Sequence, residues 1–191
     1  MKKSCSALFV KTAIALALAA PMLASAESQL VTTNTATTGA QARLNFSVVI
    51  PKVLFLAVGT GSAALAANPT IDTLSFNYTG TPADVGSGVD SAAQAVNVRV
   101  LGNNGQITLA AAGSAGGLVS GTDAIPWSEI LTTSTDATNF AVPAVGSTSA
   151  PVLSAGKVTN RNATWNYAYS NTNVAAPGTY AGQITYTATM P

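Results

Sequence analysis

The sequence predicts an all-β protein built as an antiparallel β-sandwich of about seven or eight short strands. Apolar and polar residues alternate with period two in several runs, and clusters of Gly, Ser, Thr, Asn and Pro separate those runs. After residue 26 no stretch shows a sustained helical pattern. Short alternating strands without helices favour two antiparallel sheets packed face to face.

The first 26 residues are predicted to be a cleaved secretory signal peptide. Lys2 and Lys3 precede an apolar run at residues 12–20, TAIALALAA, which is too short to span a membrane. A small-x-small cleavage site at residues 24–26, ASA, predicts a mature chain that starts at Glu27. Cys5 lies before the apolar run and is removed with the signal, so we expect no cysteine and no membrane span in the mature chain.

The mature chain is predicted to begin with a flexible arm at residues 27–42, followed by the sandwich at residues 43–191. The arm is polar and rich in threonine, so it has little to bury. The sandwich is expected to begin with a half-buried strand at residues 44–50, whose apolar side chains alternate with polar ones. Pro51 then marks a break, and residues 53–58, apolar on both faces, predict a strand buried between the two layers.

Further alternating runs predict the remaining strands. They lie at residues 74–78, 96–100, 107–111, 126–131, 165–169 and 180–188, with a weak candidate at 152–158. Asn104 and Gly105 separate two of these runs, and an Asn-Gly pair between β-rich segments predicts a hairpin.

Composition excludes several classes of function. The chain has no histidine, and only 8% of its residues are charged, against about 25% in ordinary soluble domains. Removal of the signal, with Lys2, Lys3 and Lys11, leaves five basic and seven acidic residues, a net charge of −2. The usual metal-ligand sets, imidazole catalysis and nucleic-acid binding by a basic face are therefore not expected. A serine nucleophile would need Lys52 or Lys157 as its base, and no serine has a recognisable spacing to either.

A few acidic residues are the remaining candidates for chemistry. Asp123 and Glu129 flank Trp127, and two acids around an aromatic ring could serve an exported hydrolase that acts on sugars. Asp84 and Asp90 could suggest calcium, but the segment between them lacks the dense oxygen-ligand spacing of a calcium loop. Acids in such connections usually cap turns or keep a surface soluble. We therefore expect no enzymatic activity, no catalytic, cofactor-binding or metal-binding residues, and no cofactor.

The surface composition favours assembly through strand edges. A surface of Thr, Ser, Asn and Gly with little charge gives weak self-repulsion, and strand edges then pair readily unless they are blocked. Strand addition from one chain to the next is a physical route to a polymer. A flexible N-terminal arm ahead of a sandwich is the part that such an assembly would use.

The order of these features resembles bacterial fimbrial (pilus) subunits of the chaperone–usher type. The similarity lies in the signal peptide, a long first strand, threonine-rich strands and a closing segment, PGTYAG at residues 177–182 followed by QITYTA at 183–188. The resemblance implies an immunoglobulin-like subunit that is exported to the periplasm, passed on by a chaperone and polymerised at an outer-membrane usher. It further implies copies of itself or related subunits as partners, strand exchange, a role in adhesion, and a final location in a fimbrium or on the cell surface.

Two questions stay open at the level of sequence. The exchanged strand is either the arm at residues 27–42 or the stretch at 44–50, unless the sandwich is complete in itself. A complete sandwich would favour the alternative function, a self-contained exported module that binds cell-wall or host glycan near Trp127 or another exposed aromatic residue.

Overall fold

The computed structural model describes residues 27–32, 39–60, 65–78 and 82–191. The predicted signal peptide at residues 1–26 lies outside the described residues. The chain divides into two units, Met1–Ile50 and Pro51–Pro191. The strands of the sandwich all lie in the second unit.

The described residues of the first unit contain neither helix nor strand. Arg43 forms an ion pair with Glu27, with 2.8 Å between Nε and Oε2 and a second hydrogen bond of 3.0 Å from Nη2 to Oε1. The backbone N–H of Gln41 donates to the side-chain oxygen of Gln29 at 3.0 Å. These contacts bring the two ends of the 27–43 region together, and nearly all of its described side chains are exposed.

The second unit is all-β. Within the described residues it contains nine strands and two short 3-10 helices, and these elements are β1 (Leu54–Val58), η1 (Pro82–Asp84), β2 (Gln94–Gly102), β3 (Thr108–Gly113), β4 (Leu118–Ser120), β5 (Asp123–Ile125), η2 (Trp127–Glu129), β6 (Ile130–Ser134), β7 (Thr148–Ser149), β8 (Thr159–Tyr169) and β9 (Ile184–Thr189). The short strands β4, β5 and β7 were not predicted. No helix among the described residues has the length and apolar character needed to cross a membrane.

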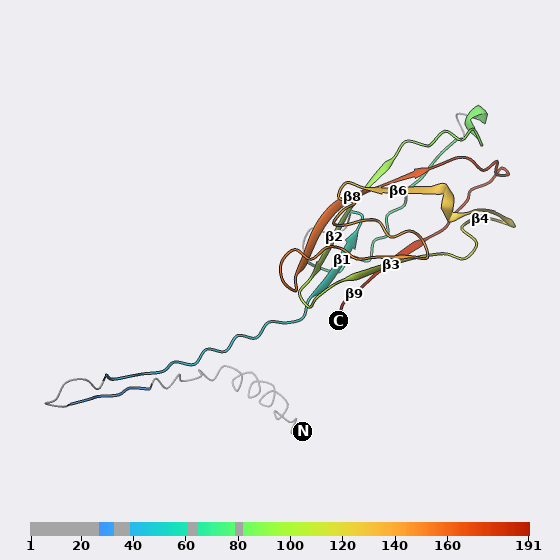
Figure 1. The fold of residues 1–191 in the computed structure, drawn as a ribbon. Coiled ribbons are helices and arrows are strands. Elements are labelled where there is room, and N and C mark those ends of the chain that lie inside the picture. The colour runs from blue at the N-terminus through green and yellow to red at the C-terminus, as the bar shows by residue number, and fades with distance from the viewer. Residues whose placement is uncertain (1–26, 33–38, 61–64, 79–81) are drawn as a thin grey trace, which may run out of the picture. The chain divides into compact units, whose positions relative to one another are not determined.

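The strands form two facing antiparallel sheets and a small extra hairpin (Figure 1). One sheet has the order β1-β2-β8-β6, the other has the order β7-β3-β9, and β4 pairs with β5 alone. Every pairing is antiparallel. The predicted antiparallel β-sandwich is therefore confirmed.

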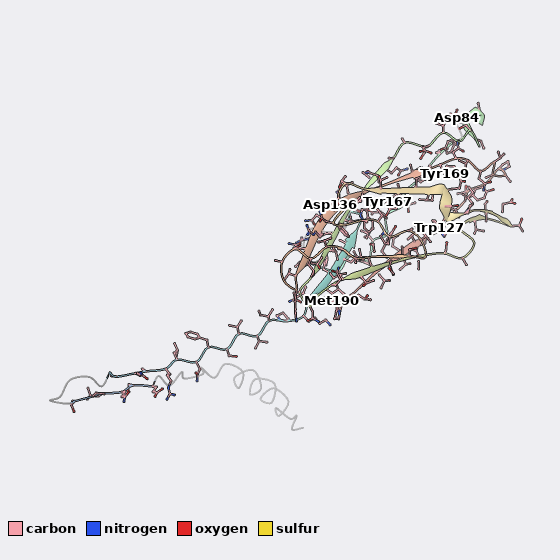
Figure 2. All side chains as sticks on the ribbon, in the orientation of Figure 1. Asp84, Trp127, Asp136, Tyr167, Tyr169 and Met190 are labelled. Carbon is pink, nitrogen blue, oxygen red and sulfur yellow. The ribbon has the colours of Figure 1, made fainter. Side chains whose placement is uncertain are left out.

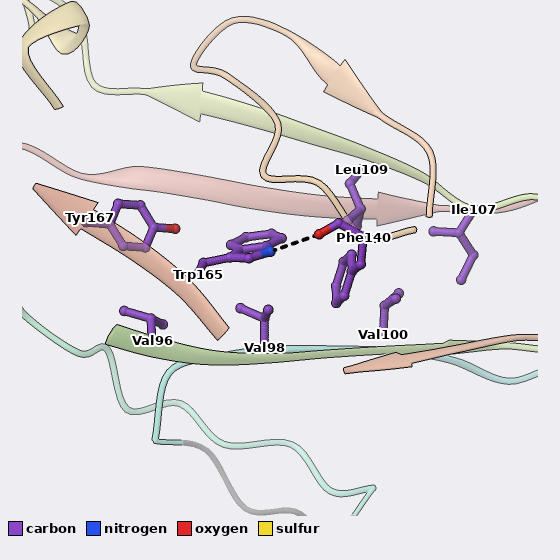
Figure 3. Close-up of a cluster of buried hydrophobic side chains, with 8 residues drawn as sticks. All are labelled: Val96, Val98, Val100, Ile107, Leu109, Phe140, Trp165 and Tyr167. Atoms are coloured by element: carbon purple, nitrogen blue, oxygen red, sulfur yellow. Dashed lines mark hydrogen bonds between the residues drawn. The ribbon is translucent and has the colours of Figure 1, made fainter. Parts of the chain in front are cut away.

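The core lies between the two sheets, where alternating side chains of β2, β3 and β8 meet. Figure 3 shows the valines of β2 on one side and Leu109 of β3 on the other, with Trp165 and Phe140 between them. The Trp165 and Phe140 rings meet edge to face, with centroids 5.4 Å apart, and both residues are fully buried. The indole N–H of Trp165 donates to the carbonyl oxygen of Phe140 at 3.4 Å, so the one polar group of the ring is satisfied.

Several predictions about individual strands are corrected by the structure. The weak candidate at residues 152–158 forms no strand, and the candidate at 126–131 contains η2 and only the start of β6. Residues 44–50 form no strand and are exposed, because no edge of a described sheet pairs with them. Residues 74–78 also form no regular strand, although Leu74 and Phe76 pack against the core. The strand at 53–58 exists as β1, but it is an edge strand and is only half-buried, whereas the sequence predicted burial between the layers.

The predicted hairpin at Asn104 and Gly105 is a connection between the two sheets. It joins β2 to β3, which belong to different sheets and do not pair. Gly105 has a φ of 99°, which favours glycine, so the turn itself is real. The neighbouring Asn103 receives a hydrogen bond from the backbone N–H of Val53 and donates one to the carbonyl of Pro51, both at 2.8 Å. These two hydrogen bonds therefore hold the residues just before β1 against the β2–β3 connection.

Candidate interaction groove

Two edge strands, β1 and β9, face one another across the open side of the sandwich. Lys52, just before β1, donates to the carbonyl oxygen of Pro191, just after β9. At the other end, Val58 of β1 and Ile184 of β9 line the same cavity. The two strands therefore run in opposite directions. Each pairs along one side only, and no strand in the described part of the chain occupies the other side.

Between these edges lies an open apolar groove with a volume of about 910 Å³. Large apolar side chains from both sheets and from the segment before β2 line it, and they are partly buried, most of them packed against the core. The main ones are Leu56, Val58, Leu74, Phe76, Ile130 and Ile184. A groove flanked by two free strand edges can accept one more strand, because its backbone pairs with an edge and its side chains fill the apolar space.

Two tyrosines form a polar contact within the groove. The hydroxyl groups of Tyr167 and Tyr186 lie 2.9 Å apart, and both residues line the groove. Burial raises the pKa of both phenols above the ordinary value, so both rings stay neutral near pH 7. The pair joins β8 of one sheet to β9 of the other and holds the two walls of the groove together.

Trp127 lines the groove near the start of β9, and Met190 lies toward the other end of β9 (Figure 2). The indole N–H of Trp127 donates to the carbonyl oxygen of Ser114 at 3.1 Å. Its ring approaches Gly113 and Gly182 so closely that a Cβ at either position would overlap it. Gly182 belongs to the closing PGTYAG segment, and here its lack of a side chain has a defined packing role. Trp127 is half-buried and does not offer the open sugar platform that the glycan hypothesis requires.

The structure assigns different environments to the two acids that flank Trp127. Asp123 is exposed on β5, whereas Glu129 is 8% exposed. The hydroxyl of Ser170 donates to Glu129 Oε2 at 2.6 Å, and the backbone N–H of Thr172 donates to the same oxygen at 3.0 Å. The Thr172 hydroxyl donates to Oε1. Burial alone would raise the pKa of Glu129, but these hydrogen bonds outweigh it and hold the pKa below its ordinary value.

The Glu129 carboxylate is therefore a structural link between η2 and the β8–β9 connection. Sequence reasoning weighed Glu129 as part of a sugar site against a structural role at a turn, and did not identify the partners that it binds. Its partners lie about forty residues further along the chain, so no local pattern identifies them.

The other acidic candidates also have local structural surroundings. Asp84 ends η1, and its carbonyl oxygen accepts a hydrogen bond from the side chain of Asn171. Asp90 is exposed. Across the described ranges no group of three or more His, Cys, Asp or Glu side chains is placed to hold a metal ion. The structure does not bring Asp84 and Asp90 into such a group.

A second feature complements the groove: an exposed apolar segment at residues 44–50, which we call segment 44–50. Phe46 is 85% exposed, Val48 81% and Ile50 76%, and Leu44 at the same spacing is 61% exposed. Four large apolar side chains at alternate positions form one face of an extended strand. Their exposure leaves one face of a strand without the partner that its pattern requires.

No known family model matches the chain, and no curated protein is significantly similar to it in sequence.

Proposed function

We propose that the protein is a structural subunit of a bacterial fimbria or surface fibre, which polymerises when segment 44–50 of one copy enters the groove of the next. One observation carries this proposal. A sandwich with two unpaired edges around an apolar groove occurs in the same chain as an exposed segment with the alternation of a core strand. The fibre would support adhesion of the cell that displays it.

The chemistry of segment 44–50 fits the groove. In an extended conformation Leu44, Phe46, Val48 and Ile50 point to one side, toward the apolar walls. Complete burial of each such side chain stabilises by about 1.5–3 kcal/mol relative to exposure. The gross gain for four of them is therefore roughly 6–12 kcal/mol, before the cost of association. Backbone hydrogen bonds to a strand edge would also fix the register of the inserted segment.

The arm at residues 27–42 fits the groove less well than segment 44–50. Its only adjacent large apolar residues are Leu30 and Val31, which point to opposite faces of an extended strand. The Glu27–Arg43 ion pair also ties its start to residue 43. Of the two donors that the sequence left open, we favour segment 44–50.

The direction of insertion decides whether assembly is open or closed. If the segment runs antiparallel to β9, its Ile50 end leaves the groove beside Val58 and Gly59, at the end of the sandwich opposite to Lys52. The next copy then lies at the end away from the acceptor's own Pro51, and a head-to-tail chain can grow without limit. In the direction parallel to β9, the inserted segment would leave the groove at the end where the acceptor's own Pro51 lies. Two copies could then exchange segments with each other, which would favour a closed dimer. A strand antiparallel to β9 is parallel to β1, because the two edges run in opposite directions, so strand pairing alone favours neither direction.

The remaining parts of the proposal follow from the resemblance to fimbrial subunits. Export to the periplasm would precede assembly, and a chaperone would cover the groove before an outer-membrane usher adds the subunit to the fibre. The alternative, a self-contained glycan-binding module, needs a closed sandwich or an open aromatic platform. The free edges of β1 and β9 and the half-buried Trp127 favour the fibre instead.

The test is assembly of the mature chain with and without the double substitution F46S/V48S. We expect the wild type to form ladders on gels without heating and filaments by electron microscopy, because its apolar face fills the groove. The double variant should stay monomeric with an unchanged circular dichroism spectrum. The matched control, N45S/S47N, alters the opposite face and should assemble. If F46S/V48S assembles as well as the wild type, segment 44–50 is not the exchanged strand.

A further inference from the structure

Segment 44–50 has an apolar residue on the face that would point away from the groove. Asn45 and Ser47 are polar on that face, but Val49 follows at the same spacing and is 90% exposed. Insertion through Phe46 and Val48 would leave Val49 on the outer surface of the fibre. Contact with another apolar side chain would remove this valine from water and add to the stability of the fibre.

Most of residues 65–72, which we call segment 65–72, line the groove. Leu65 and Ile71 both line the groove, yet Leu65 is 55% exposed and Ile71 is 72% exposed. They are large apolar side chains beside a binding groove, and in the single chain they are mostly in contact with water. They add exposed apolar surface to the lining of the groove, and we call these two side chains its rim.

Local hydrogen bonds hold segment 65–72 at one end of the groove. The Asp72 carboxylate accepts hydrogen bonds from the backbone N–H of Thr60 at 2.6 Å and from the Thr60 hydroxyl at 2.7 Å. Gly59 has a φ of 103°, and a Cβ there would overlap the Asp72 carboxylate, so glycine permits this close approach. Closer to Ile71, the side chain of Asn68 accepts a hydrogen bond from the N–H of Thr70 at 3.0 Å.

These contacts place the rim beside the end of β1, since Gly59 and Thr60 directly follow Val58. An inserted segment 44–50 that runs antiparallel to β9 has its last residues at that same end. Val49 then lies near Ile71 and Leu65, whereas in the parallel direction it would lie at the far end, beside Lys52. Val49 therefore lies near Leu65 and Ile71 only if the inserted segment runs antiparallel to β9.

We infer that segment 65–72 is a second contact surface for a neighbouring copy of this chain, and that Leu65 and Ile71 cover Val49 of the inserted strand. This inference rests on the proposed strand exchange and adds the orientation and an outer apolar contact to it. The inserted strand is then held on both faces, by the groove on one side and by segment 65–72 on the other.

The test is a double-mutant cycle on assembled fibres, with V49S, I71S and the double variant V49S/I71S. Each single variant should dissociate roughly tenfold faster than the wild type in denaturant, the change expected when one valine-sized contact is lost. The double variant should be no faster than either single variant, because both remove the same contact. V174S is the matched control, since Val174 is 78% exposed and does not line the groove, and it should leave the rate unchanged.

Two results would overturn the inference while the proposed function stands. One is a V49S fibre that dissociates at the wild-type rate, and the other is a double variant whose effect is the product of the two single effects. A wild-type chain that forms no fibre would instead overturn the strand exchange itself. Since Ile71 is mostly exposed, I71S should not change the unfolding midpoint of the monomeric F46S/V48S chain, which shows that the effect arises in the fibre.

Discussion

The strands around β2, which we call the closed half, and those beside the groove, which we call the open half, have similar apolar sequences. Their inward-facing side chains differ in burial. On β2, which lies between two strands, the inward-facing Val96, Val98 and Val100 are 7%, 3% and 0% exposed. On β1, at the edge, the inward-facing Leu56 and Val58 are only partly buried. The difference lies in the neighbours and not in the side chains. Under the proposed strand exchange, a neighbouring copy would cover the face of β1 that the single chain leaves partly exposed.

The closed half should tolerate truncation worst, and Trp165→Ala tests this. Trp165 is fully buried and contacts both Phe140 and Tyr186. Its loss leaves a large cavity, and we expect the free energy of unfolding to fall by about 3–5 kcal/mol. Denaturant unfolding of the monomeric F46S/V48S chain measures it. A loss below about 1 kcal/mol would mean that the closed half is not the stable core.

The Glu129 link should contribute less than the core, but with a distinct pH dependence. In Glu129→Gln the oxygens that accept three hydrogen bonds become a neutral amide, and we expect a loss of about 1–3 kcal/mol near pH 7. The folded-state pKa of Glu129 lies below its ordinary value of 4.5, so its contribution is complete above that value and is lost as the pH falls through the folded pKa.

The measurement is the free energy of unfolding of both chains between about pH 7 and pH 3. The wild type should lose more stability than Glu129→Gln on acidification, and the two curves should converge. Curves that stay parallel would show that the carboxylate does not contribute through its charge. The exposed Asp123→Asn is the matched control and should follow the wild type.

The smallest effect on the monomer is expected in the open half, from Leu56→Ala. Leu56 is partly buried and packs against the core from the edge strand, so its truncation should cost less than that of a fully buried leucine, about 1–2 kcal/mol in the monomeric chain. In the fibre the same side chain would contact the inserted strand, and its truncation should speed dissociation clearly. Denaturant unfolding of the monomeric chain and dissociation of the fibre measure the two effects of the substitution separately. A larger loss in the monomer than in the fibre would contradict an open groove.

Period-two alternation predicted the sandwich, and it located β2, β8 and β9 because their inward faces really are apolar. The same pattern was wrong for segment 44–50 within the single chain. Alternation shows that a segment suits a sheet, but it does not show which chain supplies the neighbouring strand. Asn104 and Gly105 illustrate a related limit, since the turn is present but joins two sheets.

The groove itself could be predicted only in part. The resemblance to fimbrial subunits suggested strand exchange, and the sequence contains the segment that would be exchanged. The facing edges of β1 and β9 depend on contacts more than one hundred residues apart, such as that between Lys52 and Pro191. The position of Trp127 in the lining of the groove likewise depends on its approach to Gly182. Neither long-range contact leaves a local signal.

The central claim is that a strand from another copy completes the open half, and hydrogen–deuterium exchange tests it most directly. The monomeric F46S/V48S chain would be mixed with a synthetic peptide of residues 43–51 in its wild-type sequence. We expect slower exchange at amides of β9 and β1, with no change in β2 or β8 and no effect of a scrambled peptide. If the peptide does not bind, or if protection appears away from the β1 and β9 edges, the claim is contradicted.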